Sequence, residues 1–154
     1  MLFRSFDVCG SKSYIAPEVL SGRGYDGFAA DMWSCGVCMF ALLFRFLPVE
    51  MAKPNDLYFR KLVRVQLEGK PSAKTIFSWY NRNLEVSLLA TDLVDALIKT
   101  EAHLRPSVTE VALHPWFYTP LPPTSSGFTL DTVKRANLFT MGGRYLNLQR
   151  AATI

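Results

Sequence analysis

The stretch CGSKSYIAPEVL, at residues 9–20, decides how this chain is organised. Its first half has the glycine and serine content of a loop. Its second half predicts a short helix near Pro17–Leu20, because proline is favoured in the first turn of a helix. Further glycines punctuate residues 1–27, so we expect mostly loop before the first long helix.

The stretch DMWSCGV, at residues 31–37, opens the most apolar part of the chain. The uncharged run from Met32 to Phe44 holds 13 residues, whereas a membrane-spanning helix needs about 20. We therefore expect a core helix over 28–44 and no membrane partner. Because this helix is apolar on nearly every face, the pattern predicts that it is buried all round.

The same run contains a C-x-x-C pair, Cys35 and Cys38. Zinc needs about four ligands, and the sequence has neither a second such pair nor a nearby histidine, so no metal site is expected. The favoured interpretation is two small core residues on a helix. Three cysteines in all fit a reducing compartment. With no secretory signal at the N-terminus, we expect a cytoplasmic or nuclear protein.

Capping residues and apolar periodicity predict further helices downstream. Asn55 suits the N-cap of a helix that reaches about Leu67, and Thr91 suits the cap of the next one. A capping box at 107–110 opens another helix, while the pattern of residues 69–90 is ambiguous. Almost no strand pattern occurs, so the expected fold class is mainly α.

Charge is spread unevenly along the chain. The 154 residues carry a net charge of +4, with 49% hydrophobic and 19% charged residues, which excludes a disordered chain. Residues 1–118 are close to neutral and present no basic face for nucleic acid, so we expect none as a partner. We divide the chain into this body, a Pro/Ser-rich linker at 119–127 and a basic extension at 128–154. The apolar excess indicates that part of the surface faces something other than water.

Four motifs in order resemble those of the protein kinase family. Residues 9–20 resemble the end of a kinase activation segment with its A-P-E motif, and residues 31–37 resemble the D-x-W-S-x-G start of the long central helix. The sequences LRPS at 104–107 and HPWF at 114–117 resemble the family's last two motifs. The resemblance covers about residues 5–118. It implies a helical kinase C-lobe without the β-rich N-lobe, somewhat like calcium/calmodulin-dependent-kinase-type members.

The resemblance also implies roles for particular residues. Glu18 and Arg105 would form a buried ion pair that ties the activation segment to the helical lobe. Asp31 would accept backbone N–H groups from the family's catalytic loop, although an aspartate at a helix start is also a favourable charge by itself. Gly10-Ser11 followed by Tyr14-Ile15 points to the Ser/Thr class. The structural motif residues carried over are Ala16, Pro17, Glu18, Asp31, Trp33, Gly36 and Arg105.

Other residues would meet the substrate or regulate its access. Ser11 corresponds to the hydroxyl that hydrogen-bonds the catalytic base in Ser/Thr kinases. Val8, Ile15 and Pro17 would shape the apolar pocket for the substrate residue after the phosphoacceptor. Asp7 stands where many kinases carry a phosphorylated threonine, so it either imitates a phosphate in part or is a solvated loop residue. The candidate phosphorylation sites are Ser5, Ser11 and Ser13.

The catalytic parts of a kinase are absent from these 154 residues. Phosphoryl transfer needs a Gly-rich loop, a strand lysine, an H-R-D catalytic loop and a D-F-G metal ligand, and the sequence contains none of them. We therefore expect no catalytic residue in this chain beyond the supporting hydroxyl of Ser11, and no cofactor. A complete family member would use ATP and Mg²⁺, whereas this polypeptide alone is expected neither to bind ATP nor to transfer phosphate.

Three functions stay open at this point. The chain is part of a Ser/Thr kinase whose upstream half is encoded before Met1, a catalytically inactive docking module, or a truncated product that does not fold stably. Protein substrates or a partner kinase are the expected partners, and calmodulin is an alternative for the basic tail, weighed against a mobile extension. An apolar cleft near Cys9–Ser11 and Met32–Gly36 is expected to make the chain aggregation-prone.

Overall fold

The computed structural model describes residues 4–5, 10–22, 24–80 and 86–119, which belong to one compact unit. The predicted basic extension and the predicted linker after Thr119 lie outside the described residues. Asp7 and Val8 also lie outside them, so the roles suggested for these two residues stay predictions.

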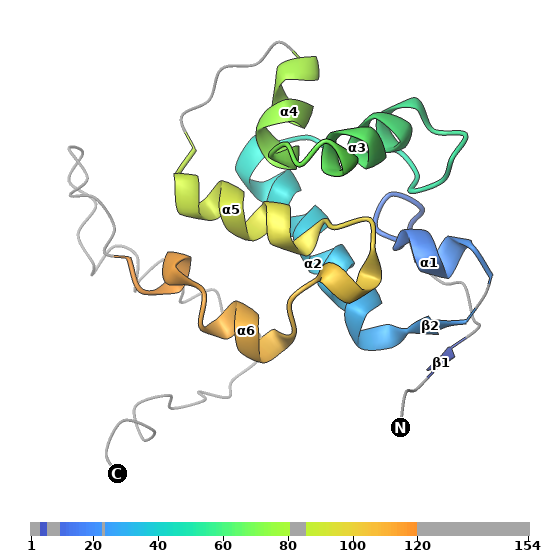
Figure 1. Cartoon of the computed structure of the whole chain (residues 1–154), viewed down its shortest axis with the longest axis horizontal. Coiled ribbons are helices and arrows are strands. Elements are labelled where there is room, and N and C mark those ends of the chain that lie inside the picture. The colour runs from blue at the N-terminus through green and yellow to red at the C-terminus, as the bar shows by residue number, and fades with distance from the viewer. Residues whose placement is uncertain (1–3, 6–9, 23, 81–85, 120–154) are drawn as a thin grey trace, which may run out of the picture. The chain divides into compact units, whose positions relative to one another are not determined.

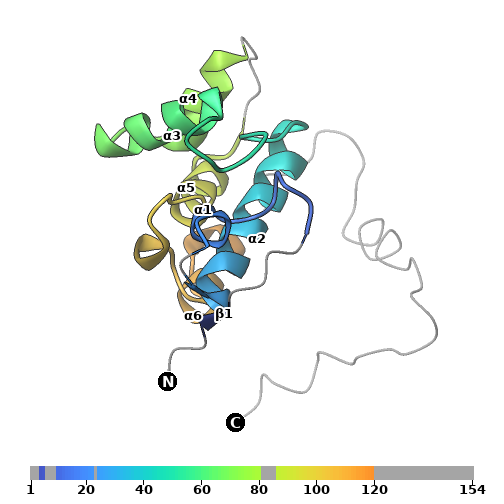
Figure 2. The same ribbon diagram turned by 90° about the vertical axis from the view of Figure 1, so that its right-hand side faces the viewer.

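The body is built almost entirely from helices, which confirms the mainly α prediction (Figure 1). Along the chain the described elements are β1 (Arg4–Ser5), α1 (Pro17–Leu20), β2 (Tyr25–Asp26), α2 (Gly27–Phe44), α3 (Leu57–Leu67), α4 (Ser72–Trp79), α5 (Leu88–Leu97), the 3₁₀ turn η1 (Ala102–Leu104), α6 (Val108–Ala112) and the 3₁₀ turn η2 (Pro115–Phe117). The two-residue strands pair antiparallel, with Arg4 opposite Asp26 and Ser5 opposite Tyr25. Helices α3 and α4 lie side by side, away from α6 in both ribbon views (Figure 2).

Helix α2 is the central element, and it packs most extensively against α5. The two helices approach closely at Gly36, where an added Cβ would lie 2.7 Å from the Leu97 Cβ and 2.8 Å from the Ile98 Cγ2. A real Cβ atom essentially never lies within 3.0 Å of another heavy atom to which it is not bonded. Glycine at position 36 is therefore what allows α5 to lie directly on α2.

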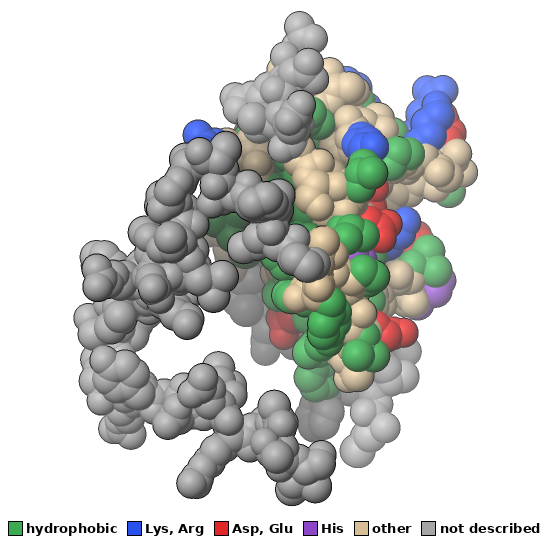
Figure 3. Space-filling view, turned by 90° about the vertical axis from the view of Figure 1, so that its left-hand side faces the viewer, with side chains coloured by type: hydrophobic (Ala, Val, Ile, Leu, Met, Phe, Trp, Pro, Cys, Tyr) green, Lys and Arg blue, Asp and Glu red, His purple; other side chains and the backbone are tan. Residues whose placement is uncertain are grey.

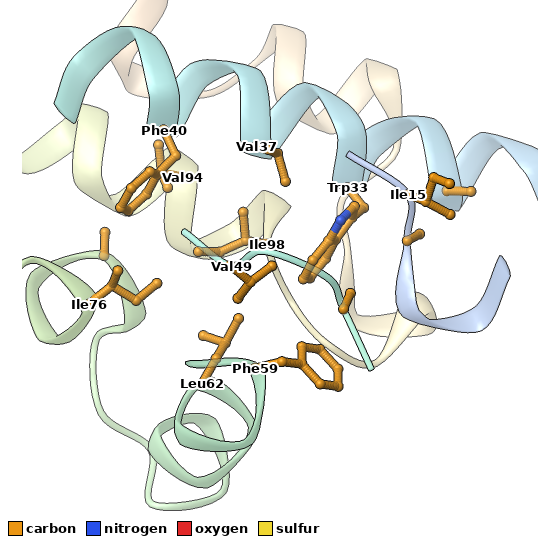
Figure 4. Packing of buried hydrophobic residues seen from close by; sticks show 14 of the residues in the cluster. Ile15, Trp33, Val37, Phe40, Val49, Phe59, Leu62, Ile76, Val94 and Ile98 are labelled. Atoms are coloured by element: carbon orange, nitrogen blue, oxygen red, sulfur yellow. The ribbon is translucent and has the colours of Figure 1, made fainter. Parts of the chain in front are cut away.

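One hydrophobic core runs along the inner face of α2 (Figure 4). Trp33, Val37 and Phe40 of α2 share this core with Val94 of α5 and with Ile98, the residue that follows α5, and all five are fully buried. The opposite side of this core is closed by residues of α3, α4 and the loop after α2, namely Val49, Phe59, Leu62 and Ile76. Ile15 joins the same core from the loop before α1.

The outer face of α2 is exposed, so the prediction that this helix is buried all round is wrong. Phe28, Asp31, Cys35, Cys38 and Leu42 are all exposed, and their spacing of three or four residues places them on one side of the helix. Phe28 is 72% exposed and Leu42 is 83% exposed. We call these five residues the α2 outer stripe.

The outer stripe also corrects the interpretation of the C-x-x-C pair. Cys35 and Cys38 are free and exposed, so they are not core residues. Their neighbours Gly36 and Val37 are buried instead. The apolar cleft expected near Cys9–Ser11 and Met32–Gly36 is corrected only at Gly36, which is buried against α5 and cannot line an exposed cleft.

By length and composition alone, α2 resembles a membrane span, with a mean hydropathy of 1.6 over its 18 residues. Its inner face packs on α5 and the rest of the core, as the central helix of a folded lobe does. No other helix among the described residues meets the same criteria.

Two predicted helix starts are wrong by a few residues. The cap of α3 is Asp56, not Asn55, because the Asp56 carboxylate accepts from the Phe59 backbone N–H at 2.8 Å and also from Met51 N–H. Helix α5 begins at Leu88, so Thr91 lies inside it, where its hydroxyl donates to the Leu88 carbonyl. The capping box of α6 is confirmed, since Ser107 and Glu110 bond reciprocally.

Candidate functional site

The loop from Gly10 to Ala16 lies along the start of α2 and is fastened to it by serine hydroxyls. Gly10 has φ of 104°, a conformation that glycine adopts readily, and Tyr14 N–H bonds back to the Ser11 carbonyl at 2.9 Å. The Ser34 hydroxyl on α2 donates to the Tyr14 carbonyl at 2.9 Å. The Ser13 hydroxyl donates to the Glu50 carbonyl at 2.9 Å. This loop is therefore attached to α2 and to the segment that follows it.

The loop continues into α1, which an ion pair joins to the far end of the chain. Arg105 meets Glu18 with two parallel contacts, Nη1 to Oε1 at 2.6 Å and Nη2 to Oε2 at 2.8 Å. The Arg105 side chain is fully buried, and that of Glu18 is 20% exposed. The ion pair expected between these residues is present, and it joins positions 87 residues apart in sequence.

Backbone carbonyls satisfy the remaining donors of Arg105. Its Nε donates to the Lys99 carbonyl at 2.7 Å, and Nη1 donates to the Ala29 carbonyl at 2.7 Å. The guanidinium also lies 5.2 Å from the centre of the Trp33 ring, a cation–π distance. A buried charge is tolerated only when it is paired and hydrogen-bonded, and Arg105 meets both conditions.

A cavity of about 230 Å³ opens between the loop and the first turns of α2. Ser11, Tyr14 and Ile15 line it from the loop, and Asp31 and Ser34 line it from α2. The wall is mostly apolar, and its polar residues include Ser11, Ser34 and Asp31. Such a cavity suits a small apolar side chain presented by an extended peptide.

The structure brings some of the predicted site residues together and leaves others apart. Ile15, Ser11 and Asp31 come together at this cavity, whereas Pro17 is the first residue of α1 and is not part of its lining. Asp31 is exposed and has no hydrogen-bond partner among the described residues, so the role suggested for it stays a prediction. Ala16, Trp33 and Gly36 are buried structural residues that position the loop and α2.

Sequence reasoning missed several polar residues that hold the helices behind the site. The Gln66 amide donates to the Ile98 carbonyl at 3.0 Å and to the Ser72 hydroxyl at 3.1 Å, and its oxygen accepts from Thr100 N–H at 2.9 Å. Asp95 on α5 accepts from the Ala73 N–H and so caps α4 from another helix. Burial raises the pKa of the Asp95 carboxyl, although this hydrogen bond and Lys99 act in the opposite direction. These contacts join residues distant in sequence, so no local pattern could reveal them.

Nothing among the described residues resembles a metal centre, because no three or more His, Cys, Asp or Glu side chains are grouped to hold an ion.

A second cavity, of about 470 Å³, lies beside the loop and is lined by Lys12, Ser13, Glu50, Met51, Asn55 and Asp56. The loop of residues 10–16 is thus anchored to the helical body and lines both cavities, an arrangement that suits binding of a peptide.

Residues 4–117 match the model of the protein kinase domain family. The chain is similar to CBL-interacting serine/threonine-protein kinase 16 of Arabidopsis thaliana, with 36% identity over 123 residues, 80% of this chain and 23% of the relative. It is also similar to the SNF1-related protein kinase catalytic subunit alpha KIN12 of the same plant, with 37% identity over 129 residues, 83% of this chain and 23% of the relative. A third relative is CBL-interacting protein kinase 31 of Oryza sativa subsp. japonica, 36% identical over 109 residues, 71% of this chain and 21% of the relative. The chain spans less than a quarter of the length of these relatives.

Proposed function

The chain belongs to the protein kinase family, and on that premise we propose that it supplies the substrate-binding part of a Ser/Thr protein kinase. The complete enzyme would transfer the γ-phosphoryl group of ATP to serine or threonine of a protein. The observation that carries the proposal is the Glu18–Arg105 pair, which fixes the loop of residues 10–16 on the helical body beside a cavity of about 230 Å³ that suits one apolar side chain. Similarity to relatives named as serine/threonine kinases supports the Ser/Thr class.

Within this proposal the loop residues meet the protein substrate. Ile15, together with Val8, forms the apolar pocket for the substrate residue that follows the phosphoacceptor, and Pro17, outside the cavity lining at the start of α1, supports this pocket. Ser11 supports the catalytic base of the complete enzyme, and Asp31 orients the catalytic loop. Asp7 and Ser13 act in regulation of the activation segment. The exposure of Ser11 and its place at the cavity edge support these roles.

The proposal assigns ATP and Mg²⁺ to parts of a kinase that these residues do not include. The family uses both, and they are held by the Gly-rich loop, the catalytic loop and the D-F-G aspartate. None of these motifs occurs in the 154 residues, so no cofactor is assigned to this chain by itself. Purified chain incubated with labelled ATP and a generic substrate should incorporate no more phosphate than a matched blank.

A chimeric kinase tests the proposed function. Residues 4–117 would replace the corresponding segment of a soluble Ser/Thr kinase that keeps its own N-lobe, catalytic loop and D-F-G motif. We expect the chimera to phosphorylate serine or threonine peptides, and Ile15→Ala to raise KM for the peptide far more than it changes KM for ATP. A chimera that folds and binds ATP with Mg²⁺ but phosphorylates no peptide would contradict the proposal.

A docking module without catalysis is the second candidate function. The exposed α2 outer stripe and the lack of catalytic motifs in these residues favour it. An inactive chimera, together with saturable binding of the chain to a partner kinase, would support this alternative. In either case we propose protein partners and a cytoplasmic or nuclear location. The names of the relatives give no support to calmodulin as a partner.

A further inference from the structure

Cys35 and Cys38 form a pair of exposed thiols on the rigid interior of α2. They lie one helical turn apart on the outer stripe, and the intervening residues Gly36 and Val37 are buried against the core. Packing of Gly36 on α5 therefore fixes the rotation of α2 about its axis. Both thiols consequently face the same way, and neither the proposed substrate cavity nor the Glu18–Arg105 pair uses them.

Helical spacing makes a direct disulfide between the two cysteines unfavourable. Residues three apart on a helix have Cβ atoms about 5–6 Å from one another, whereas a disulfide needs Cβ atoms about 3.5–4.5 Å apart. Closing the S–S bond would thus distort α2 where it meets α5. One atom bonded to both sulfurs spans the wider separation without that distortion.

The surroundings of Cys35 disfavour its thiolate form. Partial burial, the neighbouring Cys38 and the Asp31 carboxylate all raise the pKa of the Cys35 thiol. Cys35 therefore keeps its proton at neutral pH and is a poor target for simple alkylation, which needs the thiolate. No third metal-ligating side chain is grouped with the pair among the described residues, so a tetrahedral zinc site is not formed.

We propose that Cys35 and Cys38 are a dithiol modification site that takes up one soft, trivalent arsenic atom as a bridge between the two sulfurs. With an organic arsenic(III) oxide, two As–S bonds form, the As–O bond and both S–H bonds break, and the oxygen leaves with the two protons as water. Arsenic stays trivalent, so the step needs no oxidant. This modification would not depend on the kinase function proposed for the chain.

Phenylarsine oxide added to the full chain tests the site. We expect one phenylarsenic group per chain by intact-mass measurement, retained in excess glutathione and released by a dithiol such as 2,3-dimercaptopropanol. Peptide mapping should place it on the segment that holds Cys35 and Cys38. Cys9→Ser should leave this behaviour unchanged, because it removes only the third cysteine. Cys35→Ser and Cys38→Ser should each lose the glutathione-resistant adduct.

A variant with the same number of thiols at the wrong spacing is the matched control. Cys38→Ser combined with Leu42→Cys places the second thiol seven residues from Cys35 on the same stripe, about 10 Å along the helix axis, too far for one bridging atom. Leu42 is 83% exposed, so the change removes no core contact. Circular dichroism confirms that each variant is folded. A glutathione-resistant adduct in this control, or none in the unaltered chain, would overturn the proposal.

Discussion

At the scale of single residues, the buried charge of Arg105 requires a partner of opposite charge. Its side chain is fully buried, and Glu18 is the carboxylate that balances it. Removing one member of a buried pair leaves the other charge uncompensated in a poorly solvated environment. The stability of the lobe should therefore depend on both residues.

The first prediction concerns this pair. Glu18→Gln and Arg105→Gln should each lower the free energy of unfolding by about 3–5 kcal/mol, measured by urea denaturation with tryptophan fluorescence. Arg64→Gln is the control, because it breaks the exposed Arg64–Glu68 pair on α3 and should change stability little. Equal effects at the buried and the exposed pair would refute a structural role for the Glu18–Arg105 pair.

A second prediction at this scale concerns Asp95 and pH. Burial raises the pKa of its carboxyl above the ordinary value of 3.8, so the folded chain holds this proton more tightly than the unfolded chain. The stabilising contribution of the protonated form is present below pH 3.8 and is lost as pH rises through the raised pKa. Asp95→Asn removes this titration and keeps an oxygen that accepts from Ala73 N–H.

The difference in unfolding free energy between the unaltered chain and Asp95→Asn should therefore decrease as pH rises from 3 to 7. Glu68 and Glu110 have lowered pKa values and an opposite dependence on pH, but they are present in both proteins and cancel in the difference. A difference that stays constant or increases with pH would show that burial does not control the titration of Asp95.

At the scale of elements, the close contact of α2 with α5 depends on glycine, which has no side chain, at position 36. The Leu97 Cβ and carbonyl carbon would lie 2.7 Å and 3.1 Å from a Cβ at position 36. Backbone atoms cannot move aside as a flexible side chain does, so the two helices would have to separate. We predict that Gly36→Ala lowers the unfolding free energy by about 1–3 kcal/mol, the usual effect of overpacking.

Gly27→Ala on the same helix is the matched control for this prediction. A Cβ at position 27 meets no atom within 4 Å, so this change should be neutral or slightly stabilising in a thermal melt. If Gly36→Ala were equally harmless, the close approach of α5 to α2 would not be what requires glycine there.

Elements also show how far the sequence can predict the structure. The α1 turn, the long central helix and the capping box of α6 follow from signals within a few residues, and all were predicted. The predicted N-caps of α3 and α5 were wrong because Asn55 and Thr91 are residue types that favour N-caps. The observed N-caps are the nearby residues Asp56 and Ser87. Helix α4 was ambiguous because its cap, Asp95, comes from another helix.

At the scale of the whole molecule, the sequence predicted the helical lobe and its ion pair but not which face of α2 is exposed. Hydrophobic periodicity reports how apolar a face is, not whether anything covers it. Phe28, Cys35 and Leu42 are apolar enough for a core, yet no described residue buries them. This exposed surface accounts for at least part of the apolar excess in the composition.

The last prediction follows from this exposed face. Exposed apolar side chains favour association in water, so the purified chain should bind a hydrophobic dye and self-associate as concentration rises. Phe28→Glu combined with Leu42→Lys should reduce both effects without loss of stability, because the new charges lie in the first and last turns of α2 and suit its dipole. Leu67→Lys is the control, since Leu67 is 84% exposed but lies on α3, outside the outer stripe. Analytical ultracentrifugation distinguishes the outcomes: if Leu67→Lys reduces association as much as the double variant, the outer stripe is not the associating surface.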